Sequence, residues 1–201
     1  TNIKRMLAYS TIAHAGYMIM PVAAAVLLVG SDEIAAGDAI SALLLYAAIY
    51  LFMNLGAFAI VAFLRNSMQS ETIDDYSGLI RTAPVTAVAM TLILVSLVGL
   101  PPLAGFWPKL KVFMALYQAG GPVLITVLVV AALNTVISLI YYLRVAKRMC
   151  IDPEPDSRGP VEMGLFPSVY VFAITIPVVL FGIYPTWLTN LTQVAGESFF
   201  R

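Results

Sequence analysis

Two lysines stand in a part of the chain that is otherwise apolar. Lys109 and Lys111 occur in the sequence GFWPKLKVF, inside a hydrophobic stretch long enough to cross a membrane. A lysine at the centre of a membrane helix costs roughly 2.5–3.5 kcal/mol on insertion scales, so its presence suggests a use. An amine shielded from water could gain and lose a proton near neutral pH. We interpret Lys109 as a candidate proton carrier.

The alternative for both lysines is structural. Their aliphatic stems could lie along apolar surface while the ammonium groups reach the membrane interface. Lys109 directly follows a predicted helix break, which favours a functional role, whereas the sequence does not decide between the two for Lys111. Because no Asp or Glu lies inside a predicted span, their partners must be neutral polar groups or other chains.

Neutral polar residues recur at helical spacing in three other apolar stretches. Residues three or four apart share one face of a helix. The three stripes are Ser10, His14 and Tyr17; Tyr46, Tyr50 and Asn54; and Asn134, Ser138 and Tyr141 or Tyr142. Facing inward, they could hold a chain of water molecules beside Lys109. The alternative is ordinary hydrogen bonding between helices, worth about 0.6 kcal/mol per bond on average.

The composition indicates the elements that must position these residues. The chain has 201 residues, 61% of them hydrophobic and 11% charged, whereas a soluble domain is about 45–50% apolar and about 25% charged. This excludes a cytosolic enzyme, a nucleic-acid-binding protein and a disordered chain. A single cysteine, Cys150, and a single histidine, His14, leave no disulfide framework and no metal site. Nucleotide loops, haem ligands and cluster cysteines are also missing from the sequence, so we expect no cofactor here.

Helices of about 20 mostly apolar residues account for this composition. We predict an all-α integral membrane protein forming a single membrane domain over residues 1–201. Its five transmembrane helices are expected over residues 6–29, 39–64, 84–117, 122–145 and 165–188.

The third predicted span is too long for one straight helix. Its roughly 34 residues would extend about 50 Å, against a hydrocarbon core of about 30 Å. Its middle holds Gly99, Pro101, Pro102 and Gly105, and such residues interrupt helical hydrogen bonding and relax the backbone. We predict one crossing made of two half-helices, discontinuous from Gly99 to Gly105. Discontinuous membrane helices often form ion sites.

The zero net charge conceals an uneven distribution. If the chain crosses five times, one side receives Lys4, Arg5, Arg65, Arg81, Arg144, Lys147, Arg148 and Arg158; the other receives Arg201 with Asp32, Glu33, Asp38 and Glu197. Basic residues favour the cytoplasmic side. We therefore expect a multi-pass protein of the cell's inner (plasma) membrane, with its N-terminal end cytoplasmic and its C-terminal end outside, in the periplasm.

Several segments carry a family resemblance: NIKRMLAYSTIAHAGYM, YLFMNLGAF, DYSGL, SLVGLPPLAGFWPKLKVF and ISLIYYLRVAKRM. Up to about Met149 they resemble the N-type antiporter-like membrane subunit of respiratory complex I, the proton-pumping NADH:quinone oxidoreductase; the last span matches only in hydropathy. Related subunits carry His-x3-His-x3-Lys where this chain has Tyr46, Tyr50 and Asn54, which favours the N-type.

The resemblance implies a fourteen-helix antiporter-like fold of which this chain is the last part, the N-terminal helices being absent. It implies that Lys109 corresponds to the lysine of the second broken helix, on the proton path toward the outside, and that His14 and Lys4 lie on or near a central hydrophilic axis. Trp107-Pro108 departs from the family's usual GFxGK pattern. Quinone, NADH, FMN and Fe–S clusters are then expected in other subunits. The expected partners are the other membrane subunits of complex I, the lipid bilayer and protons, with no nucleic acid.

The predicted function is proton translocation coupled to quinone reduction, with no redox centre in this chain. The candidate proton-transfer residues are Lys109, His14, Lys4, Tyr46, Tyr50, Asn54, Ser138 and Tyr141. Two alternatives remain open at this point: a subunit of a multisubunit cation/proton antiporter, and a structural membrane scaffold.

Overall fold

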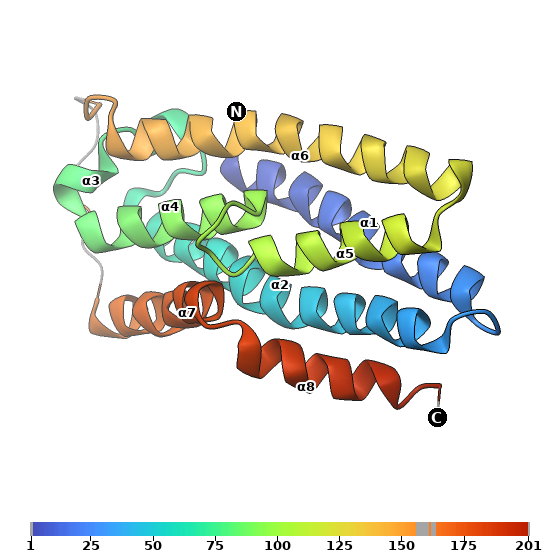
Figure 1. Ribbon diagram of the computed structural model, residues 1–201. Coiled ribbons are helices and arrows are strands. Elements are labelled where there is room, and N and C mark those ends of the chain that lie inside the picture. The colour runs from blue at the N-terminus through green and yellow to red at the C-terminus, as the bar shows by residue number, and fades with distance from the viewer. Residues whose placement is uncertain (1, 156–160, 162–163, 201) are drawn as a thin grey trace.

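The computed structural model describes residues 2–155, 161 and 164–200, which form a bundle of helices (Figure 1). The long elements are α1 (Ile3–Leu28), α2 (Glu33–Met68), α4 (Pro84–Val98), α5 (Phe106–Ala119), α6 (Gly121–Cys150), α7 (Leu165–Ile183) and α8 (Thr186–Glu197). A 3-10 turn, η1 (Ile73–Tyr76), and a single helical turn, α3 (Leu79–Thr82), connect α2 to α4. The prediction of an all-α fold is confirmed.

Four of these helices, α1, α2, α6 and α7, are long and apolar enough to cross a membrane. The longest, α2, has 36 residues, or about 54 Å of helix, so it extends beyond a hydrocarbon core of about 30 Å. Because its polar ends remain helical, α2 exceeds the predicted span 39–64, and α6 exceeds 122–145 in the same way.

The predicted break in the third span is confirmed. The first half, α4, ends at Val98, and the second half, α5, begins at Phe106. Gly99 closes α4 in the left-handed region with φ 89°, where its N–H bonds back to Val95 and Ser96 carbonyls. Laid end to end, α4 and α5 run the length of the bundle beside α2 (Figure 1). The two half-helices therefore form one crossing.

The fifth span differs from its prediction as one helix over residues 165–188. The helix α7 ends at Ile183, and a separate helix, α8, starts at Thr186. Pro185 explains the difference, because proline has no N–H to donate and excludes the preceding residue from helical geometry. Tyr184 accordingly has φ −123° and ψ 71°. The second helix then continues along α2 toward the far end of the bundle (Figure 1).

The two interruptions pack against each other. The indole Nε1 of Trp107 donates to the Gly182 carbonyl at 2.9 Å, and the Ala104 amide donates to the Val178 carbonyl at 3.0 Å. A Cβ on Gly182 would lie 2.1 Å from the Pro102 carbonyl oxygen, so only glycine fits this approach. The second half of the irregular backbone between α4 and α5, Leu103–Gly105, is thus buried against α7, whereas Leu100, Pro101 and Pro102 are exposed on the described part of the chain.

Charged side chains gather where α1 begins and α2 and α6 end. The ion pairs there are Lys4–Glu71 (3.6 Å), Arg65–Glu71 (3.2 Å), Arg148–Asp74 (2.5 Å) and Lys147–Asp152 (3.9 Å). Arg158 and Arg201 lie outside the described residues. The basic residues that the structure describes here belong to the side predicted to be cytoplasmic.

Candidate proton-transfer site

Lys109 lies inside the bundle, with 5% of its surface exposed. Its Nζ donates to the carbonyl oxygens of Val98 at 2.7 Å and Leu97 at 3.1 Å. The same Nζ lies 4.8 Å from the centre of the Tyr17 ring, a favourable position for a cation. Since the side chain bonds to interior carbonyls, its ammonium does not reach for an interface.

The broken helix supplies these carbonyls. The last carbonyls of a helix have no intrahelical partner and form the negative end of its dipole, which attracts a cation. Because α4 stops at Val98, its two last carbonyls are available to Lys109. Gly99 leaves space for the lysine stem, since a Cβ there would lie 2.6 Å from the Lys109 Cδ.

His14 is the centre of a second polar group, built from α1, α2 and α6. Its Nδ1 lies 2.8 Å from the Tyr46 hydroxyl, and its Nε2 lies 3.4 Å from the Tyr142 hydroxyl. The Tyr142 hydroxyl also hydrogen-bonds to Ser10. The result is a continuous polar chain, Ser10–Tyr142–His14–Tyr46, across the buried interior.

The ring of Tyr17 lies between this polar chain and Lys109. Its ring stacks on Tyr46 with centroids 6.1 Å apart, and the Lys109 ammonium lies over the same ring. Its hydroxyl donates to the Ala131 carbonyl at 2.6 Å and lies 2.8 Å from the Thr135 hydroxyl. The Tyr17 hydroxyl thus bonds to α6, and its contacts with Tyr46 and Lys109 are made by the ring alone.

The other predicted residues lie around this centre. Tyr50 is buried and stacks on His14 with centroids 4.9 Å apart. Asn54, farther along α2, accepts a hydrogen bond from Thr11 at 3.5 Å. Ser138 donates to the Thr135 carbonyl at 2.7 Å, and the ring of Tyr141 lies 4.5 Å from that of Tyr142.

Lys4 does not lie with the polar residues around His14 and Lys109. Its side chain is 59% exposed and pairs with Glu71 at the end of the bundle. Asn2 Nδ2 also donates to the Glu71 carboxylate at 3.0 Å. This hydrogen bond, together with the charges of Lys4 and Arg65, lowers the pKa of Glu71 below its ordinary value. The structure thus gives Lys4 a contact with a surface carboxylate, and its predicted role in proton transfer stays a prediction.

Two features of the centre were absent from the predicted site. Tyr142, rather than its neighbour Tyr141, reaches Ser10 and His14. The sequence left the two tyrosines open, because they lie three and four residues after Ser138 and both spacings fit one helix face. The carbonyls that bind Lys109 belong to the main chain, so no residue type could have indicated them.

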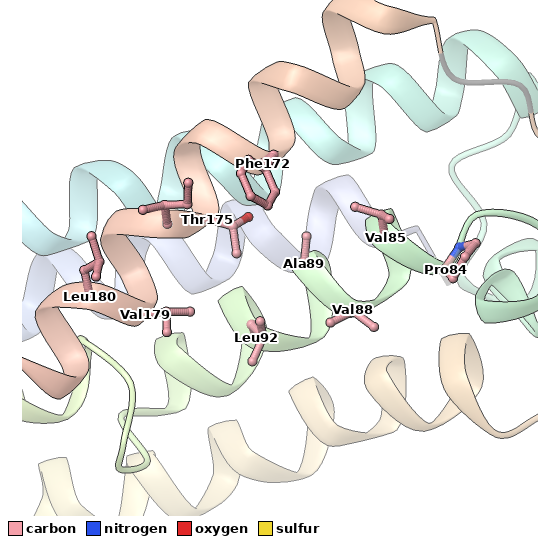
Figure 2. A pocket seen from close by; sticks show the side chains of 10 residues that line it. Pro84, Val85, Val88, Ala89, Leu92, Phe172, Thr175, Val179 and Leu180 are labelled. Atoms are coloured by element: carbon pink, nitrogen blue, oxygen red, sulfur yellow. The ribbon is translucent and has the colours of Figure 1, made fainter.

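A groove between α4 and α7 is lined almost entirely by apolar side chains. It encloses about 540 Å³ and is lined by Pro84, Val85, Val88, Ala89, Leu92, Phe172, Thr175, Ile176, Val179 and Leu180 (Figure 2). The Thr175 hydroxyl is its one polar side-chain group, and that hydroxyl donates to the Val171 carbonyl at 2.7 Å. With no protonatable side chain in its lining, the groove is not a proton-transfer site.

Comparison with known proteins finds relatives that are subunits of NADH-quinone oxidoreductase. NADH-quinone oxidoreductase subunit N 1 of Koribacter versatilis is 39% identical over 200 residues, covering 90% of this chain and 37% of the relative. NADH-quinone oxidoreductase subunit N of Paramagnetospirillum magneticum is 38% identical over 201 residues, covering 100% of this chain and 38% of the relative. The chain therefore spans less than half the length of these curated relatives.

A solved structure shows the same arrangement of helices. A chain of respiratory complex I from Thermus thermophilus, solved with bound aureothin, superposes with a TM-score of 0.72 at 27% sequence identity. The match covers 94% of this chain and 40% of the Thermus chain. In addition, the family profile described as "NADH:quinone oxidoreductase/Mrp antiporter, TM" matches residues 1–135. The chain thus belongs to the NADH:quinone oxidoreductase/Mrp antiporter family of membrane proteins.

Proposed function

We propose that this chain is part of a proton-translocating membrane subunit of NADH:quinone oxidoreductase, with Lys109 as the group that binds and releases the proton. One observation carries the proposal: among the described residues, the buried lysine bonds to neutral groups only, the Leu97 and Val98 carbonyls and the face of Tyr17. A carboxylate partner would hold the lysine in its charged form through a direct ion pair. Carbonyl dipoles stabilise the charge less strongly, so the proton can also leave.

The polar chain from Ser10 to Tyr46 supports proton delivery to this lysine. Its hydroxyl and imidazole groups stand within hydrogen-bond distance of one another. The hydroxyl of Tyr50, buried beside His14, has no hydrogen-bond partner among the described residues. Buried polar groups are normally satisfied, so a water molecule or another part of the subunit is the expected partner. We infer a hydrated path through His14 to Lys109.

In this proposal the redox chemistry takes place in other subunits of the complex. NADH, FMN, Fe–S clusters and quinone would bind there, and this chain would respond to quinone reduction by transferring protons. Neighbouring membrane subunits and the lipid bilayer are the expected partners. We place the subunit in the inner membrane, with the end bearing Lys4 and Arg148 in the cytoplasm, because basic residues favour that side.

The test is Lys109→Ala in the full-length subunit within the assembled complex. We expect proton pumping coupled to NADH oxidation in inverted membrane vesicles to fall to a small fraction of its normal rate. Lys147→Ala is the matched control, because Lys147 is exposed and its ammonium lies 3.9 Å from Asp152 at the bundle end. Unchanged pumping in an assembled Lys109→Ala complex would rule out the proposed role.

A second candidate comes from the family itself, whose description includes Mrp antiporters. An antiporter subunit would exchange cations for protons without NADH oxidation. Measuring sodium-dependent proton movement in vesicles without NADH separates the two functions, and we expect none from this subunit. The names of the relatives, both NADH-quinone oxidoreductase subunits, favour the first proposal.

A further inference from the structure

A cavity that contains two arginines lies between α1 and α6 at the basic end of the bundle. Its volume is about 400 Å³, many times the roughly 30 Å³ that one water molecule occupies in the liquid. Most of its wall comes from Arg5, Met6 and Tyr9 of α1 and from Tyr141, Arg144 and Val145 of α6. Both arginines are exposed, so the cavity is open to the surface. It can therefore admit a group larger than a single ion.

The cavity carries positive charge without a counter-ion among the described residues. In that part of the chain, no Asp or Glu lines the cavity, and no ion pair involves Arg5 or Arg144. The nearby carboxylates of Glu71 and Asp74 are paired with other basic side chains. Two guanidinium groups that share one cavity repel each other. The cavity is therefore suited to an anion.

The two helices present the same order of side chains to the cavity. The helix α1 begins at this end of the bundle, and α6 ends there. On α1, Arg5 precedes Tyr9 by about one turn. On α6, Arg144 follows Tyr141 by about one turn. Each arginine thus lies nearer to the end of the bundle, and each tyrosine lies one turn deeper. Tyrosine is enriched at the level where lipid head groups meet the hydrocarbon core.

Below the tyrosines, the same helix faces become apolar. Residues three or four apart share one face of a helix. On α1 this face leads from the cavity to Ile12 and Ile19, and on α6 it leads to Ile137 and Leu133. All four side chains are exposed. A cationic cavity above an exposed apolar surface fits a molecule with an anionic head group and long hydrocarbon chains.

We propose that this cavity binds the phosphate group of an anionic phospholipid, held by Arg5 and Arg144, with the acyl chains along α1 and α6. The planar guanidinium fork matches the oxygens of a phosphate group, and anionic lipid head groups bind in basic pockets between membrane helices. A free phosphate ion has no hydrocarbon to place on the apolar surface below. The layer of tyrosines favours a lipid over an acidic protein segment. The site is separate from Lys109, so the proposal does not depend on proton transfer there.

The test uses the full-length subunit in the assembled complex, reconstituted in phosphatidylcholine vesicles that contain a small share of photoreactive phosphatidylglycerol. After illumination, the labelled peptides of α1 and α6 are quantified by mass spectrometry. We expect the double variant Arg5→Gln/Arg144→Gln to lower this labelling several-fold. Photoreactive phosphatidylcholine with the same acyl chains should label the unmodified protein only at the level of the variant, because its head group has no net charge.

The matched control is the double variant Arg65→Gln/Lys147→Gln. Both residues are exposed at the same end of the bundle but do not line this cavity. The control removes the same number of positive charges, and we expect normal labelling of α1 and α6. An equal loss in both double variants would show that only the total charge of this end attracts the lipid, and it would overturn the site.

Other outcomes would also contradict the proposal. Full competition by inorganic phosphate at the concentration of the photoreactive lipid would show that a free anion suffices. Unchanged labelling in the arginine double variant would rule out the lipid; if that variant also lost a neighbouring subunit, the cavity would belong to an acidic protein segment. The single variants Arg5→Gln and Arg144→Gln, which perturb assembly less, should each lower the labelling, and a normal level in both would likewise exclude the site.

Discussion

Among single residues, Lys109 shows how a membrane protein can retain a buried amine without a carboxylate. Two carbonyls at the end of α4 and the face of Tyr17 provide partial negative charge on several sides. These interactions offset part of the cost of burying the ammonium. Because none of them is a full charge, the neutral amine is also tolerated, and this balance is what a proton carrier requires.

The polar chain allows a test at Tyr142 of α6. Tyr142→Phe removes the hydroxyl that joins Ser10 to His14, and we expect slower proton pumping. The stability loss should be small, because hydrogen bonds between membrane helices contribute about 0.6 kcal/mol on average. Tyr117→Phe is the control, because Tyr117 is 73% exposed, and it should pump near the normal rate. Equal pumping by both variants would contradict a path through His14.

Glu71 gives a pH-dependent prediction outside the membrane. Its pKa in the folded protein lies below the ordinary 4.5, so its contribution to stability is present above that pH and is lost as the pH falls through the lowered value. The Ile3 amide, which donates to the Glu71 carbonyl at 2.9 Å, reports on this contact. We expect its protection from hydrogen exchange to decrease on acidification.

Glu71→Gln is the corresponding variant. It should lower the protection of the Ile3 amide already at neutral pH and remove the part of the pH dependence due to Glu71. The change should be modest, because Lys4 and Arg65 are exposed and such ion pairs contribute little. A variant with the same pH profile as the unmodified protein would show that the carboxylate does not stabilise this contact.

Among the elements, the broken helix α4–α5 is the one on which the site depends. Glycine at position 105 permits the Ser96 carbonyl to approach, since a Cβ there would lie 1.8 Å from that oxygen. Gly105→Ala would force the two half-helices apart, a strain of about 1–3 kcal/mol or more. We expect reduced assembly of the complex and slow pumping, because the α4 carbonyls would move away from Lys109.

Gly16→Ala is the control for this substitution. Gly16 lies within α1, and a Cβ there meets no atom within 4 Å. Alanine is favoured over glycine inside a helix by roughly 0.5–1 kcal/mol, so the thermal stability of the solubilised complex should stay equal or rise. If Gly105→Ala assembled and pumped as well as Gly16→Ala, the close approach of the Ser96 carbonyl to position 105 would not be needed for assembly or pumping.

The same elements show what the sequence could predict. The break from Gly99 to Gly105 was predictable because glycine and proline act locally on the backbone. The second interruption, at Tyr184 and Pro185, was not predicted: the span was expected to continue to residue 188, whereas α7 ends at Ile183 and α8 begins at Thr186. Its position along α2 depends on the glycine contact between Gly37 and Gly196, which is a property of tertiary packing.

The sequence likewise predicted only part of the candidate site. Polar stripes on three helices predicted which faces turn inward, and the structure brings His14, Tyr46 and Tyr50 together. The choice between Tyr141 and Tyr142 depends on how α6 is rotated against α1, and adjacent residues differ by about 100° around a helix. Carbonyl ligands and the hydrogen bond from Lys111 to Ser41 depend on how several elements meet, so periodicity within one helix could not indicate them.

For the molecule as a whole, the distribution of charge predicts its orientation in the membrane. Ion pairs of Lys4, Arg65 and Arg148 gather at one end, and a cavity lined by Asp38 and Lys111 lies toward the other. Basic residues near the ends of spans are retained on the cytoplasmic side. The end with these ion pairs is therefore predicted to face the cytoplasm and the other end the outside.

Cysteine labelling tests this orientation directly. Asn66 is exposed at the basic end of α2, and Ser31 is exposed in the turn between α1 and α2 at the opposite end. With an impermeant maleimide, Ser31→Cys should react in right-side-out vesicles and Asn66→Cys in inverted ones. The reverse pattern would place the end with Lys4, Arg65 and Arg148 on the outer side and would overturn the orientation predicted from the charges.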